Sequence, residues 1–185
     1  MNIFILDNCP KKAAIMHIDK HLIKMILETA QLLSTCHRVL DGVKTVGLSK
    51  KGRKSTKYTL PDSREEILYK STHVNHPCSV WLRQSNENYN WLFSLYESLL
   101  QEYQYRYGRV HKCSNLYYSL KYPPNKITYR YMTDFAQAMP DEYKNEDAVE
   151  AYREFYIKDK SKKMKMTWKK RNVPEWYKEQ ANANV

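Results

Sequence analysis

Glycine is scarce in this sequence. All-β proteins and doubly wound α/β proteins need glycine at many of their turns, so the scarcity disfavours both classes. We expect a mainly α protein, formed by a single compact helical domain over residues 1–180 and followed by a frayed tail at 181–185. The 185-residue chain has only four glycines, which are Gly42, Gly47, Gly52 and Gly108.

Long apolar runs and closely spaced cysteines are also missing. No run of eighteen apolar residues occurs, so we predict no transmembrane segment. The first residues, MNIFILDNCPKK, have neither the basic region nor the apolar length of a signal peptide. The four cysteines form no CxxC pair, which indicates reduced thiols rather than a zinc site. We therefore expect a monomer in the cytoplasm (the host cytoplasm if the protein is viral), with no membrane partner, metal ion or cofactor.

Acidic residues are few compared with basic ones. The chain has 31 Lys and Arg against 20 Asp and Glu, a net charge of +11. Such an excess favours nucleic acid as a partner, with an anionic membrane surface as the alternative. Two segments hold much of the charge, residues 41–63 and residues 158–171. The basic residues that we expect to contact double-stranded DNA through its phosphates are Lys50, Lys51, Arg53, Lys54, Lys169, Lys170 and Arg171.

Apolar periodicity predicts several helices. We expect one helix over about 12–40, a short one over 64–72, a long one from His76 to the Gly108 stop, and another from about Asp147. The basic segment 41–63 is long for a loop, and such loops are usually functional. It favours a basic loop or a small β-hairpin, with strands at Val43–Val46 and Lys57–Leu60.

The predicted helix at 12–40 carries an unusual polar stripe. Its members follow one another at steps of four, three, four and three, which places them on one helical face. The rest of the helix is apolar, which is typical of a buried helix. A polar stripe on a buried helix must be hydrogen-bonded or must line a cavity. The stripe consists of His17, His21, Lys24, Glu28 and Gln31.

The stripe has two interpretations. Glu28 beside Lys24 would have a tunable pKa, as general acid/base catalysis requires, so the stripe could line a functional pocket. It could instead be purely structural. A metal site on His17, His21 and Glu28 is disfavoured, because Ile18 stands where the zincin pattern needs a glutamate.

A second, smaller polar stripe begins the next long helix. His76 and Arg83 fall on one side of it, and an arginine among apolar residues needs an anion. Glu28 or a phosphate could supply that anion. An ordinary surface arginine is the equal alternative.

Several of these motifs together resemble the phage pyrimidine-dimer DNA glycosylases (the endonuclease V family). Asp19-x-His21-Leu22, with Glu28 at the sixth position after Leu22, is similar to the motif of that family's active-site helix. His76 and the Leu-rich segment that ends at Gly108 resemble its histidine and long helix. Pro174–Tyr177 (PEWY) resembles the Pro-x-Trp-Tyr near its C-terminus. The order of the motifs agrees over most of the chain.

The resemblance implies an all-α enzyme that flips a nucleotide out of duplex DNA, because the reactive atoms of a stacked base are out of reach. By position, Glu28 inherits the carboxylate that stabilises the sugar cation. The family's nucleophile is an α-amine exposed by removal of Met1, but Asn2 disfavours that removal. Lys24, if it were buried beside a base, could supply an amine instead.

Three hypotheses about function follow. The first is a base-flipping DNA glycosylase-like enzyme acting on a damaged or modified base in phage DNA. Its catalytic residues would be Glu28, Lys24 and His21, with His17, Gln31, His76 and Arg83 binding substrate. The second is a transferase of the same fold that modifies a base, for example a hypermodified thymine. The third is a basic DNA-binding protein without catalytic activity.

Overall fold

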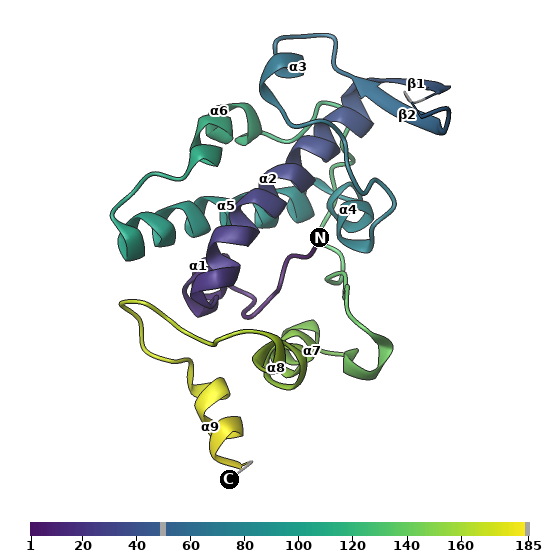
Figure 1. The fold of residues 1–185 in the computed structure, drawn as a ribbon. Coiled ribbons are helices and arrows are strands. Elements are labelled where there is room, and N and C mark those ends of the chain that lie inside the picture. The colour runs from purple at the N-terminus through teal and green to yellow at the C-terminus, as the bar shows by residue number, and fades with distance from the viewer. Residues whose placement is uncertain (49–50, 184–185) are drawn as a thin grey trace.

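Helices dominate the computed structural model, which describes residues 1–48 and 51–183 (Figure 1). The two longest, α2 (Asp19–Asp41) and α5 (Asn86–Tyr107), pack against each other at the centre. The predicted mainly α class is therefore confirmed. The other elements are α1 (Pro10–Met16), β1 (Val43–Leu48), β2 (Lys54–Thr59), α3 (Arg64–Ile67), α4 (Pro77–Leu82), η1 (Lys112–Leu116), α6 (Tyr117–Leu120), η2 (Asp141–Tyr143), α7 (Ala148–Phe155), the π-helix η3 (Tyr156–Lys160), α8 (Ser161–Lys163) and α9 (Glu175–Ala183).

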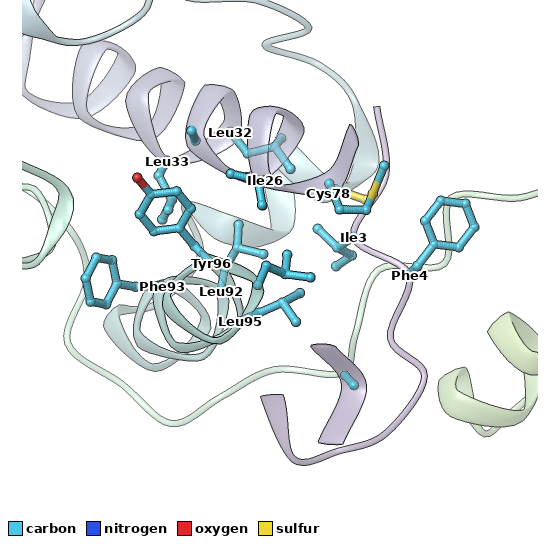
Figure 2. Close-up of a cluster of buried hydrophobic side chains, with 14 of the residues drawn as sticks. Ile3, Phe4, Ile26, Leu32, Leu33, Cys78, Leu92, Phe93, Leu95 and Tyr96 are labelled. Atoms are coloured by element: carbon cyan, nitrogen blue, oxygen red, sulfur yellow. The ribbon is translucent and has the colours of Figure 1, made fainter. Parts of the chain in front are cut away.

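The apolar core lies between α2 and α5. Figure 2 shows Ile26 and Leu33 of α2 opposite Leu92 and Tyr96 of α5. The N-terminal segment Ile3–Leu6 enters the same core, and each of its four side chains is at most 3% exposed. Burial of this much apolar surface fixes the start of the chain, because exposing each side chain again would cost about 1.5–3 kcal/mol.

The single helix predicted over 12–40 is interrupted. α1 ends at Met16 and α2 begins at Asp19, while His17 adopts an extended conformation between them. The cause is distant in sequence: the buried Arg106 guanidinium donates to the carbonyls of Ile15 (2.8 Å) and His17 (2.9 Å). It also donates to the Asp19 carboxylate at 3.0 Å. These bonds supply partners for the backbone groups that a helix end leaves unpaired.

The helix predicted from His76 is also divided. α4 ends at Leu82, and Ser85 starts α5 by accepting a hydrogen bond from the Asn88 N–H at 3.0 Å. A serine N-cap of this kind begins a new helix. The predicted stop is confirmed, since Gly108 follows α5 with a left-handed φ of 66°.

The predicted β-hairpin in the basic segment is confirmed. β1 and β2 are antiparallel, with Val43 opposite Thr59 and Leu48 opposite Lys54. Gly42 lies between α2 and the hairpin. A Cβ atom at this position would be only 2.4 Å from the Arg38 carbonyl oxygen, so no side chain fits there. The hairpin projects from the end of α2 (Figure 1), and most of its residues are exposed.

The remaining predicted elements differ mainly in length. The helix predicted over 64–72 is only one turn long, as α3. The helix predicted from Asp147 begins at Ala148, with the Asp147 carboxylate as its N-cap. In the predicted frayed tail, residues 181–183 belong to α9, and 184–185 lie outside the described residues. Over the described ranges, no helix has the length and apolar character to cross a membrane.

Candidate functional site

Two amino groups and a carboxylate meet at the middle of α2. One carboxylate oxygen of Glu28, Oε2, accepts a hydrogen bond from the backbone N–H of Asn2 at 2.8 Å. The amino nitrogen of Met1 lies 3.9 Å from the same oxygen. Lys24 Nζ lies 3.4 Å from the other oxygen, Oε1. Only 12% of the Glu28 side chain is exposed, so the carboxylate is held largely by groups of the protein.

Lys24 is on the solvent side of this cluster. Its side chain is 60% exposed, so the condition under which Lys24 was considered as a nucleophile, burial beside a base, is not met. An exposed ion pair one helical turn apart stabilises a protein by only about 0.3–0.5 kcal/mol. Lys24 is therefore an exposed amine beside Glu28 rather than a buried one.

His17 and His21 lie in the interior, away from solvent. His21 Nδ1 shares a 2.6 Å hydrogen bond with the Tyr156 hydroxyl, and the imidazole lies 4.5 Å from the Phe4 ring. His17 Nδ1 lies 2.6 Å from the Ala13 carbonyl oxygen, while Nε2 is buried without a partner. Burial lowers the pKa of His21 to about 3 and that of His17 to about 4, so both are neutral at pH 7. The break before α2 takes His17 out of the predicted stripe.

His76 lies near the Glu28 cluster, whereas Arg83 does not pair with it. His76 caps α4, with Nδ1 accepting from the Cys78 N–H at 3.2 Å. Burial lowers the pKa of His76, and the charge of the Met1 amine lowers it further. The Glu28 carboxylate acts in the opposite direction. The imidazole of His76 is therefore within electrostatic range of both the Met1 amine and Glu28. Arg83 instead donates to Ser79 Oγ (2.7 Å) and to the Val74 carbonyl (2.8 Å).

The structure thus joins only part of the predicted stripe. Lys24 and Glu28 are adjacent, and Gln31 is half-buried one turn further along α2. The two buried histidines do not join this pair, because hydrogen bonds to Ala13 and Tyr156 hold them in the interior. A metal site on His17, His21 and Glu28 is not formed, and no group of three or more potential ligands gathers elsewhere in residues 1–48 and 51–183.

The hairpin presents basic side chains to solvent. Lys51, Arg53 and Lys54 are exposed at its outer end, and Lys50 lies outside the described residues. The stretch from residue 42 to residue 61 contains no Asp or Glu. The hairpin leaves α2 thirteen residues after Glu28 (41 − 28), about 20 Å along the helix axis. Its cations can therefore contact a phosphate backbone some distance from the Glu28 cluster.

The three basic residues near the C-terminus have different roles. Arg171 forms an ion pair with Glu102 at 2.8 Å, and Glu102 also pairs with the buried Arg106 at 2.7 Å. The charge of Arg171 is therefore used within the protein. Lys169 and Lys170 are exposed, with their Nζ atoms over tyrosine rings at 5.1 and 5.7 Å.

Sequence reasoning missed the contact between the chain's first residues and Glu28. It considered Lys24 as the source of the amine, because Asn2 disfavours the removal of Met1. The available signal was the apolar run at residues 3–6, since an anchored apolar segment also fixes the residues next to it.

Comparison of this chain with protein-family models, curated proteins and solved structures finds no match.

Proposed function

We propose that the protein is a DNA-binding, base-flipping enzyme of the DNA glycosylase type, with Glu28 as its central catalytic residue. The observation that carries this proposal is the Glu28 carboxylate lying 3.4 Å from Lys24 Nζ and 3.9 Å from the Met1 amine. An amine beside a carboxylate is the pair that nucleophilic attack on a sugar carbon needs. The net charge of +11 and the exposed hairpin lysines support DNA as the substrate.

The chemistry follows from these groups. The amine lone pair forms a bond to C1′ of the flipped nucleotide, and the base leaves with the electrons of the glycosidic bond. Glu28 stabilises the positive charge that develops on the sugar, and it takes the proton that the attacking amine loses. The C1′–O4′ bond then breaks and O4′ takes up the proton that Glu28 received, which leaves an imine between the amine and C1′; water hydrolyses this imine and releases the amine.

We propose the Met1 amine as the nucleophile, because it approaches the same carboxylate oxygen that accepts the Asn2 N–H, whereas 60% of the Lys24 side chain is exposed to solvent. Removal of Met1 would free the Asn2 nitrogen, which already lies 2.8 Å from Glu28 Oε2. Mass spectrometry of the intact protein identifies which residue carries the free α-amine.

Borohydride trapping tests the proposal. Duplex DNA with one abasic site is incubated with the protein and sodium borohydride, and the covalent adduct is mapped by peptide mass spectrometry. We expect an adduct on the α-amine that persists in Lys24→Arg and is nearly lost in Glu28→Gln. An adduct on Lys24 would keep the reaction class and change the nucleophile. The absence of any adduct, together with the absence of base release, would reject the proposal.

One observation favours a second candidate, a DNA-binding protein without catalysis. With 12% of Glu28 exposed, a substrate reaches the carboxylate only after Lys24 or the first residues move aside. Duplex binding without an adduct, base release or a modified base would identify this second function.

A further inference from the structure

The chain from Tyr118 to Tyr131 exposes an unusual amount of aromatic surface. We call this segment the tyrosine track. Four of its tyrosines are 70–92% exposed, although large aromatic rings are normally well covered. Tyr129 and Tyr131 line the same open hollow, of about 630 Å³, beside the start of α5. The four exposed tyrosines are Tyr118, Tyr122, Tyr129 and Tyr131.

The track is also basic. Residues 103–133 contain no Asp or Glu, and Lys121, Lys126 and Arg130 are exposed. None of these three forms an ion pair within the described part of the chain. Two carboxylates lie beside the track: Asp41, which accepts hydrogen bonds from two of its backbone N–H groups, and Glu87 in the hollow, whose Oε1 accepts from Asn86 Nδ2 at 2.9 Å. Asp134 follows the end of the track in sequence.

The backbone of the track is anchored. The Asn86 N–H donates to the Thr128 carbonyl at 3.0 Å, and the Arg130 N–H donates to Asn86 Oδ1 at 2.8 Å. At the middle of the track, the Asn125 and Lys126 N–H groups both donate to the Asp41 carboxylate at 3.1 Å. The track is therefore fixed between α2 and α5 while its rings face solvent.

We infer that the tyrosine track binds a single-stranded segment of nucleic acid, whose bases stack on Tyr129 and Tyr131 and whose phosphates contact Lys126 and Arg130. Alternating aromatic and basic side chains are the means by which proteins hold single strands without reading their sequence. A duplex hides the faces of its bases, so exposed rings favour an unpaired strand. The inference rests on the nucleic-acid partner proposed above but not on the Glu28 chemistry.

The test measures the binding of the full chain to two fluorescein-labelled probes by anisotropy. One probe is a 16-nucleotide oligo(dT) strand, and the other is a 16-base-pair duplex. The key variant is Tyr129→Ala with Tyr131→Ala, and its matched control is Tyr129→Phe with Tyr131→Phe, which keeps both rings. A third variant, Tyr118→Ala, removes an equally exposed ring outside the hollow. Thermal melting verifies that each variant is folded.

We expect the double Ala variant to bind oligo(dT) about 10- to 100-fold more weakly, because stacking on each ring contributes substantially to affinity. The double Phe variant should bind as the unchanged protein does, and the Tyr118→Ala variant should lose severalfold less. Duplex affinity and borohydride trapping should be unaffected, so failure of this inference is separable from failure of the proposed function. If the double Ala variant binds oligo(dT) normally, the track is not a single-strand surface and the inference is wrong.

Discussion

At the scale of the residue, the surroundings of Glu28 fix the direction in which its carboxylate points. It accepts the Asn2 N–H at 2.8 Å and lies near two amino groups, the Met1 amine and Lys24 Nζ. A carboxylate held in one orientation is pre-organised to stabilise a cation that develops beside it.

Replacing Glu28 by Gln separates catalysis from structure. The amide oxygen can still accept the Asn2 N–H, and the exposed Lys24 keeps its contact with water, so the melting temperature should change little. If Glu28 is catalytic, the trapping rate should fall about 10²- to 10³-fold. DNA affinity should hold or rise, because a negative charge is removed. A large drop in melting temperature, with activity lost only in proportion to unfolding, would assign Glu28 a structural role instead.

At the scale of the element, the junction of α1 and α2 depends on Arg106. This side chain is fully buried and bonds two backbone carbonyls and two carboxylates. Arg106→Met should reduce the free energy of unfolding by about 3–5 kcal/mol, because it leaves buried acceptors without a partner. Urea unfolding measures this loss. Arg171→Met removes the other, partly exposed partner of Glu102 and should cost about 1 kcal/mol or less; equal losses would contradict the special role of Arg106.

The basic hairpin should supply electrostatic affinity without contributing to stability. Lys51→Gln with Lys54→Gln should lower the slope of log affinity against log salt by up to about 2, since each phosphate contact contributes about 0.9. Fluorescence anisotropy with duplex DNA at several salt concentrations measures the slope. Lys144→Gln with Lys178→Gln is the matched control, because both lysines are exposed but paired with carboxylates at 2.6 and 2.8 Å. Equal slopes for the two double variants would remove the hairpin from the DNA interface.

The elements differ in how far the sequence specifies them locally. The hairpin, the Gly108 stop and the Asp147 cap depend on residues within or beside the element, and they were predictable. Ser85 was also a local cap signal, but the apolar pattern running past it favoured one long helix. The break at His17 had no local signal, because the residue that stabilises it, Arg106, lies 89 residues further along the chain.

At the scale of the whole molecule, three buried histidines should make stability depend on pH. Burial lowers the pKa of His17 and His37 to about 4 and that of His21 to about 3, against an unfolded value near 6.5. Their folded pKa values are depressed, so the native state is at full stability above pH 6.5 and loses stability as pH falls from 6.5 towards 4. By pH 5 each histidine should cost up to about 2 kcal/mol.

Urea unfolding at pH 7 and at pH 5 measures this effect. His37→Gln should reduce the difference in stability between the two pH values, since it removes one of the buried histidines whose pKa is lowered. His73→Gln, at an exposed position, should leave the difference unchanged. A protein equally stable at pH 7 and pH 5 would show that the histidines are accessible to protons in the folded state.

The candidate site was only partly predictable at this scale. Lys24 and Glu28 are neighbours because they lie one helical turn apart, which spacing alone specifies. Their closeness to Met1 depends on the route of the buried segment Ile3–Leu6 across the core, and no periodicity encodes that route. The histidines fit the stripe by spacing, but their bonds to Ala13 and Tyr156 assign them to the interior.

The buried N-terminal segment has a practical consequence for making the protein. Any residues attached ahead of Met1 would lie beside Glu28, since the Met1 nitrogen is 3.9 Å from the Glu28 carboxylate. A purification tag fused there would turn the Met1 α-amine into an amide and crowd the groups around Glu28. The few residues that remain after a tag is cleaved would have the same effect. An affinity tag placed after α9 avoids both effects. Recombinant protein for assays of this site is therefore best prepared with the tag at the C-terminal end.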